Sequence, residues 1–216
     1  MLRPPVSYEI VAEIFILLNS KGRKANDHEQ RRFKYRGNGI NLLRKCTELP
    51  IFKKVTGDGR RFQRGKDEEL VLRYFALYIW LNIQKIEFEG INHLLNQTIL
   101  YINDNIDIGF RLLDDFKSGL EKTIDTLGVD CFSIEKGVPY ALNSGLFETI
   151  CNIASFENVS SNELFQIVME IKKDNDFIDR VHKNTRSNII YRYKFVEHIK
   201  NHQNATKTTS EKFQVL

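Results

Sequence analysis

The stretch R-G-K-D-E-E-L-V-L-R-Y-F-A-L-Y-I-W, residues 64–80, decides the fold that this sequence predicts. It opens with mixed charge and then becomes almost wholly apolar, which is typical of a helix buried on most of its faces. Asp67 can accept hydrogen bonds from the free N–H groups of the first turn, and Glu68 and Glu69 follow where the helix dipole favours anions. We therefore expect a central buried helix with the other segments packed around it.

One charged residue, Arg73, interrupts the apolar part of this helix. A guanidinium at such a position needs an acidic or phosphate partner, because an unpaired buried charge is very costly. Glu69 stands four residues before it, and a helical ion pair is favourable in that order. Two interpretations remain open for Arg73: an ion pair with a core carboxylate, and a functional site.

Apolar residues recur at helical spacing along the whole chain, and period-two alternation does not persist anywhere. The expected fold class is therefore all-α, an irregular bundle of about nine helices. They are expected at residues 7–18, 27–35, 64–80, 91–101, 110–127, 143–154, 161–173, 174–182 and 187–200, with shorter helical segments at 40–46 and 51–55. Asn143 or Ser144 is expected to cap one helix, Ser160 and Glu163 form a capping box for the next, and Gly128 ends another.

This pattern predicts one helical domain over residues 1–200. Within it, residues 1–66 form basic helices and loops and residues 67–200 form the helical core. Residues 201–216 are polar and are expected to form a flexible, disordered tail.

Charge is distributed unevenly along the chain, although the net charge of +4 is modest. Residues 1–66 carry 16 Lys and Arg against 6 Asp and Glu, whereas residues 67–180 carry 9 against 20. A basic first third fits contact with nucleic acid or bound phosphate. Packing against the acidic middle of the chain, or simple solvation, explains the same pattern, and the sequence leaves these three interpretations open.

The cysteines, Cys46, Cys131 and Cys151, are far apart and include no C-x-x-C pair, which argues against a zinc site or a disulfide framework. No apolar run approaches the length that crosses a bilayer, and the first residues lack a signal peptide's apolar stretch. We therefore predict a soluble cytoplasmic protein with no membrane partner.

Residues 27–35 and 56–66 are the most polar part of the basic third. The first is expected to be a helix that borders solvent or carries a binding face, and the second is a glycine-bearing loop without the Walker spacing. Its glycines would let backbone N–H groups approach an anion, but a flexible solvated loop is the favoured interpretation. The nucleic-acid candidates in or directly beside these segments are Arg32, Lys34, Arg36, Arg60, Arg61 and Lys66.

A catalytic set of Ser, His and Asp, or of Cys and His, cannot be assembled from the sequence. His198 and His202 lie four apart on one predicted helix, but no third ligand is evident, so we predict no metal and no cofactor. The best polar cluster contains the candidates for contact with an anion or nucleotide, which are Asn19, Gly22, Glu29, Arg31, Arg64 and Arg73, together with Glu69. Glu29 and Arg31 are two apart and should point to different sides of their helix.

Several ordered motifs resemble a prokaryotic family. They are L-R-P-P from residue 2, E-I-F-I-L-L-N-S-K-G from residue 13, H-E-Q-R-R-F-K-Y-R-G from residue 28, R-G-K-D-E-E-L-V-L-R-Y-F-A-L-Y from residue 64, L-N-S-G-L-F-E-T-I from residue 142 and D-F-I-D-R-V-H-K-N-T-R-S-N-I-I-Y-R from residue 176. Together they resemble the helical part of the ParB/sulfiredoxin-like N-terminal domain of GmrSD-type modification-dependent restriction systems. The resemblance spans residues 2–200.

The chain also departs from that family. Lys21 replaces the first glycine of the usual pair, and His28, Gln30 and Arg32 stand where the family tends to have other residues. The family's Asp-Gly-Gln-Gln-Arg loop, linked there to nucleotide hydrolysis and DNA cleavage, has no counterpart, and neither has its His-Asn-His nuclease domain. The resemblance therefore implies a helical lobe without the catalytic lobe, as from a truncated gene, a split protein or a fragment.

Three functions follow as hypotheses. The resemblance implies a non-catalytic lobe of an anti-phage restriction protein that assembles with a nucleotide- or DNA-processing partner, or associates with itself, through a charged or apolar concave surface near residues 27–35 and 56–66. The basic first third independently suggests a stand-alone helical bundle that binds DNA. A plain helical adaptor for another protein is the third hypothesis. None of the three makes the chain an enzyme by itself.

Overall fold

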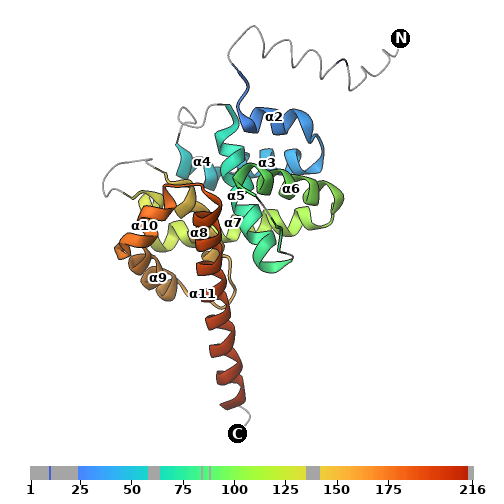
Figure 1. Ribbon diagram of the computed structural model, residues 1–216. Coiled ribbons are helices and arrows are strands. Elements are labelled where there is room, and N and C mark those ends of the chain that lie inside the picture. Colours follow the sequence, from blue (N-terminus) through green and yellow to red (C-terminus); the bar gives the residue numbers. More distant parts are fainter. Residues whose placement is uncertain are drawn as a thin grey trace.

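The computed structural model describes residues 10, 24–57, 64–83, 85–87, 89–134 and 142–213, with side chains as far as residue 203. Ten α-helices and one 3-10 helix make up this described part (Figure 1). They are α2 Asp27–Lys34, α3 Asn38–Glu48, α4 Pro50–Thr56, α5 Lys66–Asn82, α6 Ile91–Asp104, α7 Ile108–Leu127, η2 Val129–Phe132, α8 Ser144–Ala154, α9 Ser161–Lys173, α10 Asn175–Val181 and α11 Arg186–Phe213. In the same ranges β-structure is limited to an isolated antiparallel bridge between Ser133 and Leu142. The prediction of an all-α fold is confirmed, while the helix predicted at residues 7–18 lies outside the described residues, apart from Ile10.

Helix α5 is the centre of the bundle. Every residue from 70 to 79 is buried, as the apolar run of the sequence predicts. The helix packs against α3, α6, α8 and α11, so it contacts elements from both ends of the chain. In Figure 1, α2, α3 and α6 lie at one end of the molecule and α8 to α11 lie at the other, with α5 and α7 between them.

The start of α5 depends on a glycine. Arg64 and Gly65 both have a positive φ, 65° and 77°, and reverse the chain before the helix begins. A Cβ atom on Gly65 would also lie 2.6 Å from Cδ2 of His28, so a side chain is excluded on two grounds. Asp67 Oδ1 accepts a hydrogen bond from the Glu68 N–H at 2.9 Å, within the first turn as predicted. This tight turn brings α2 against the amino-terminal end of α5.

Helices α7 and α8 pack closely against each other in the core. The helix residues 145–154 of α8 are all buried, and Asn143 caps α8 by accepting hydrogen bonds from Gly145 N and Leu146 N, as predicted. A Cβ atom on Gly119 of α7 would lie 2.9 Å from the carbonyl oxygen of Cys151, so only glycine allows this contact. One hydrophobic cluster extends from Ile40 to Val196 and joins both ends of the molecule.

Most predicted helix ends agree with the structure within a few residues. The capping box of Ser160 and Glu163 is present at the start of α9, and Gly128 follows the last residue of α7 with a φ of 79°. The last helix is longer than predicted, because α11 continues past Lys200 to Phe213. No glycine or proline interrupts residues 201–213, so nothing local ends the helix at Lys200. In Figure 1 this last part of α11 projects away from the bundle.

Candidate functional site

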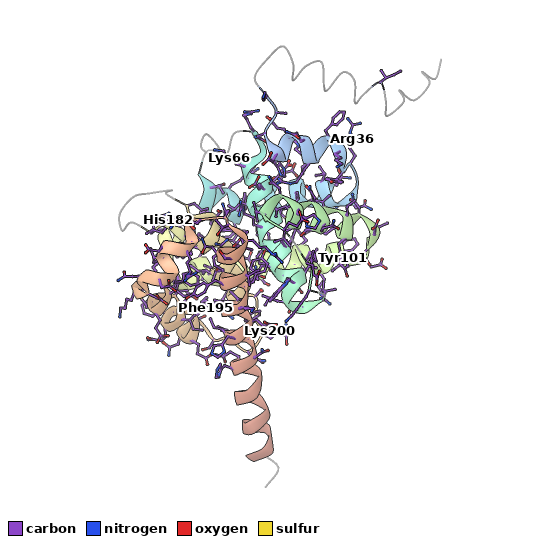
Figure 2. The ribbon with its side chains drawn as sticks, in the orientation of Figure 1. Arg36, Lys66, Tyr101, His182, Phe195 and Lys200 are labelled. Atoms are coloured by element: carbon purple, nitrogen blue, oxygen red, sulfur yellow. The ribbon has the colours of Figure 1, made fainter. Side chains whose placement is uncertain are left out.

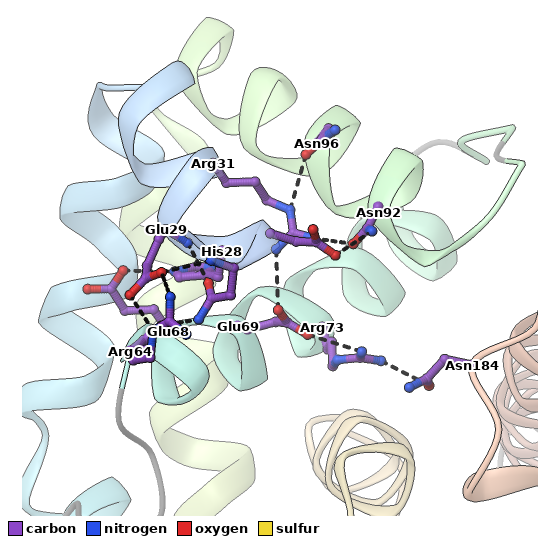
Figure 3. Close-up of polar contacts among 12 residues, drawn as sticks. His28, Glu29, Arg31, Arg64, Glu68, Glu69, Arg73, Asn92, Asn96 and Asn184 are labelled. Atoms are coloured by element: carbon purple, nitrogen blue, oxygen red, sulfur yellow. Dashed lines mark hydrogen bonds and ion pairs between the residues drawn. The ribbon is translucent and has the colours of Figure 1, made fainter. Parts of the chain in front are cut away.

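The polar cluster predicted from the sequence separates into two groups in the structure. Arg31 and Arg73 meet around Glu69, whereas Arg64 pairs with Glu29 on another side of α2 (Figure 3). Glu29 and Arg31 therefore point to different sides of their helix, as expected. Two further predicted members, Asn19 and Gly22, lie outside the described residues.

Arg31 is buried and uses three guanidinium nitrogens on protein acceptors. Its Nε donates to Asn96 Oδ1 at 3.1 Å, its NH1 donates to Glu69 Oε2 at 3.3 Å, and its NH2 donates to Asn92 Oδ1 at 2.5 Å. Burial lowers the pKa of Arg31, and Glu69 partly opposes that shift. Because its nitrogens are engaged, Arg31 joins α2 to α5 and α6 and is not available to an external anion.

Arg73 is also paired inside the protein. Its NH2 donates to Glu69 Oε1 at 3.1 Å, its NH1 donates to Asn184 Oδ1 at 3.2 Å, and Glu148 Oε2 lies 4.0 Å from NH1. Burial raises the pKa of Glu69, but the positive charges of Arg73 and Arg31 outweigh it and hold that pKa below its usual value. The structural interpretation of Arg73, an ion pair with core carboxylates, is therefore the one that the structure supports.

Arg64 holds the beginning of α2. Its Nε donates to Glu29 Oε1 at 2.8 Å, its NH2 donates to Glu29 Oε2, and the same NH2 donates to the Lys24 carbonyl oxygen at 2.7 Å. Glu29 also accepts from the Asn26 N–H, completing a capping box with Asn26. The hydrogen bond that Arg64 donates to Glu29 raises the pKa of Arg64. This pair therefore has a structural role in fixing the helix start.

An open groove lies between α2 and α3, and we call it the α2–α3 groove. It has a volume of about 480 Å³ and is lined by Glu29, Arg32, Phe33, Arg36, Asn41 and Arg44. Two of the predicted nucleic-acid candidates, Arg32 and Arg36, meet in it, and Figure 2 labels Arg36 at the end of the molecule where α2 lies. Arg44 of α3 completes the cluster, although the sequence did not single it out.

The carboxylates nearest to these arginines already have other partners. Glu29 is paired with Arg64, and the buried Glu68 accepts a hydrogen bond from His28 at 2.9 Å. The same Glu68 lies 3.3 Å from Arg32 Nε and 3.7 Å from Arg44 Nε. One carboxylate is thus shared by two arginines and a histidine, so the groove keeps an excess of positive charge.

Exposure separates the three arginines of the groove. The side chains of Arg32 and Arg44 are 36% and 50% exposed, and Arg36 is also exposed. Among the residues that the structure describes, Arg36 has no carboxylate partner and lies over the Phe33 ring, with Cζ 5.1 Å from the ring centroid. Arg36 and Arg44 are therefore the cations of the groove best placed to meet a ligand.

The remaining nucleic-acid candidates lie elsewhere. Lys34 is exposed and lies over the Tyr35 ring, with Nζ 5.1 Å from the centroid. Lys66 lines a different pocket of about 330 Å³ beside Glu69 and Arg73. Arg60 and Arg61 lie outside the described residues. The basic third thus places its charges on several surfaces, and the α2–α3 groove is where three arginines converge.

Metal and thiol chemistry receive no support from the described side chains. Within the described ranges, no three His, Cys, Asp or Glu residues form a group that could hold a metal ion. His198 and His202 are stacked edge to face, with ring centroids 4.2 Å apart. Burial raises the pKa of all three thiols, that of Cys131 to about 12, so they stay protonated and weakly nucleophilic.

The comparisons with known proteins add no assignment. No protein-family model, no curated protein and no solved structure matches the chain. In the described part of the chain, no helix is both long enough and apolar enough to cross a membrane. The candidate site therefore depends on geometry and charge alone, and the family resemblance of the sequence stays a prediction.

Proposed function

We propose that this protein binds nucleic acid, with the phosphate backbone held in the α2–α3 groove by Arg36 and Arg44 and with Arg32 behind them. One observation carries the proposal. Three arginines converge on an open groove in which Glu29 is paired with Arg64 and the single carboxylate of Glu68 is shared by His28, Arg32 and Arg44.

The chemistry of arginine supports phosphate as the ligand. A guanidinium presents a planar set of donors that matches phosphate oxygens and stays charged at any physiological pH. Arginines that lie close together on a surface repel one another, and a bound polyanion reduces this repulsion. The exposed positions of Arg36 and Arg44 leave their donors accessible to such a polyanion.

A salt titration with a labelled oligonucleotide tests the proposal. The logarithm of the affinity should fall linearly with the logarithm of salt concentration, because each neutralised phosphate releases a counterion. Three arginine contacts to a single strand predict a slope of about −2. Fluorescence anisotropy measures the affinity of single-stranded and duplex oligonucleotides across the series.

Variants locate the contact. Arg36→Ala and Arg44→Ala should each weaken binding and reduce the magnitude of the slope by about 0.7 on a single strand. Arg180→Ala is the matched control, because Arg180 is a partly exposed arginine of α10 that is paired with Asp176. Absence of binding at low salt, or an equal effect of all three variants, would contradict the proposal.

Assembly with a DNA- or nucleotide-processing partner is a second candidate. The family resemblance implies a charged concave junction beside residues 27–35, and the α2–α3 groove is a charged concave surface on α2. In this case the purified chain would bind oligonucleotides only in the presence of the partner. Co-purification of the tagged chain from its source, followed by the same anisotropy measurement on the complex and on the chain alone, separates the two candidates.

Neither candidate assigns a reaction to this chain. Arg31, Arg64 and Arg73 hold the fold together, which leaves the predicted anion cluster without a free catalytic cation among its described members. Hydrolysis of GTP or cleavage of DNA by the purified chain would overturn this part of the proposal. A cytoplasmic location and a role in restriction remain predictions from the sequence.

A further inference from the structure

A large aromatic side chain is exposed close to the α2–α3 groove. Phe110, in the first turn of α7, is 77% exposed, and Ile106 just before that helix is 63% exposed. Phe110 is the most exposed large apolar side chain among the described residues. Single exposed apolar residues are common on protein surfaces, so the surroundings of Phe110 decide whether it has a role.

Those surroundings combine apolar side chains with basic and amide side chains. Phe110 lines a pocket of about 460 Å³ between α3 and α7, and we call it the α3–α7 pocket. Arg44 and Asn41 line both this pocket and the α2–α3 groove, so the two hollows are neighbours on α3. Lys45 adds a second cation to the lining, and Glu48 adds a carboxylate.

Of the two aromatic rings beside these arginines, Phe110 is the accessible one. Phe33 in the α2–α3 groove is half-buried and lies under the guanidinium of Arg36. Phe110 has no aromatic or cationic partner among the described residues, so its ring face is open to a ligand. An open ring next to arginine is the combination that proteins use to bind unpaired bases.

We propose that the α3–α7 pocket takes an unpaired nucleobase stacked on Phe110, within a single strand whose phosphates lie on Arg44 and Arg36. The inference rests on the proposed function and makes its ligand a single strand. In a duplex the faces of the bases are covered by their neighbours, whereas an unpaired base offers its face to an aromatic ring. The side-chain amides of Asn38 and Asn41 lie in the same pocket and can hydrogen-bond a base edge.

The charge of the pocket argues against a second copy of the chain as its occupant. A two-fold contact centred on Phe110 would bring Arg44 and Lys45 close to the same residues of the other copy, and this repulsion opposes association. An extended protein interface also needs about 800 Å² on each partner, whereas the apolar surface here centres on two exposed side chains.

The first experiment compares single-stranded and duplex oligonucleotides with wild-type protein and Phe110→Ala. We expect Phe110→Ala to lose about tenfold in affinity for single strands, because stacking on one base is removed. Duplex affinity and the salt slope should stay unchanged, since the arginines are intact. Phe165→Ala, which removes another exposed phenylalanine on α9, should change neither affinity. Matched DNA and RNA strands show which sugar is preferred.

A second experiment reports the contact directly. Phe110→Trp places an indole at the proposed stacking position, and its fluorescence should be quenched when a single strand binds but not when a duplex binds. Phe165→Trp is the matched control and should show no quenching. Both variants keep the Trp80 signal, which is subtracted with the wild-type protein, and circular dichroism checks that they fold.

The outcomes separate the two proposals. Wild-type binding to single strands that Phe110→Ala leaves unchanged would overturn the stacking inference and leave the proposed function standing. Failure of the wild-type protein to bind any oligonucleotide at low salt would overturn both. Light scattering that reveals a wild-type dimer, abolished by Phe110→Ala, would overturn the stacking inference and identify the pocket as a protein interface.

Discussion

Two groups of arginines in this protein differ in what surrounds them. Arg73 and Arg192 come from largely apolar stretches of α5 and α11 and are buried against carboxylates, whereas Arg36, in the turn between α2 and α3, and Arg44 of α3 are exposed at an open groove. The first group holds helices together, and the second has charge to offer a ligand. The comparison teaches that an arginine within an apolar run indicates a carboxylate partner inside the protein. A ligand site is instead found where exposed arginines outnumber the carboxylates near them.

Arg192 on α11 is more buried than Arg73, because its side chain is fully buried. Its Nε donates to Glu148 Oε1 at 2.8 Å, and its NH1 donates to the carbonyl oxygens of Arg180 and Lys183 at 3.2 Å each. Glu148 is itself fully buried on α8. This pair therefore ties the last helix to the core in a place that water does not reach.

The largest effect is expected from Glu148→Ala. Removing this carboxylate leaves the charge of Arg192 buried without its partner, and such losses cost about 3–5 kcal/mol of unfolding free energy. Urea denaturation followed by circular dichroism measures the loss. The double variant Glu148→Leu with Arg192→Met should recover much of it, because no uncompensated charge remains. A loss below about 1 kcal/mol would show that the two arginine groups differ less than their burial suggests.

The next largest effect is expected from Arg31→Ala. This change leaves Asn92 and Asn96 without their donor and removes one of the two arginines on Glu69, which should cost about 1.5–3 kcal/mol. The same urea experiment measures it. Arg31→Lys should recover only part of the stability, since one ammonium cannot reproduce the three separate donors. If Arg31→Ala were as stable as the wild type, Arg31 would have no structural role and would belong with the exposed arginines.

A smaller loss of stability is expected when the pH is lowered and Glu69 becomes protonated. Its pKa is held below the ordinary value in the folded protein, so the unfolded chain binds a proton more readily. The stability that this carboxylate contributes is therefore present above the ordinary Glu pKa of about 4.3 and is lost as the pH falls through the folded value. Comparing urea midpoints of wild type and Glu69→Gln from neutral pH downward should show a smaller decline in the variant. Parallel declines would contradict the assignment.

The smallest effect on stability is expected from Arg36→Ala. The side chain is exposed and has no carboxylate partner among the described residues, so the change in unfolding free energy should stay within about 0.5 kcal/mol. The same variant is expected to weaken oligonucleotide binding, which is the reverse of the behaviour expected for Arg31→Ala. Measuring both quantities on both variants is the sharpest check of the comparison, and a large loss of stability in Arg36→Ala would break it.

The sequence alone was sufficient for features that depend on neighbouring residues. The all-α class, the buried helix at residues 70–79, the cap at Asn143 and the capping box at Ser160 are all present. Each depends on spacing of three or four residues or on one helix turn, which periodicity and capping preferences describe. The requirement that Arg73 find a carboxylate was also predictable, because a buried charge needs a partner in any fold.

Only the tertiary structure decided which arginines were left for a ligand. Arg31 looked like an anion-binding candidate because its partners, Asn92 and Asn96, stand 61 and 65 residues away and carry no local signal. Arg44 was missed since nothing on its own helix marks it, and it gains meaning when α3 packs beside α2. Phe110 was predicted only as the first residue of its helix, and the packing of the helices leaves its side chain 77% exposed. Local patterns follow from the backbone's own periodicity, whereas the pairing of charges and the exposure of a ring depend on which helices come together.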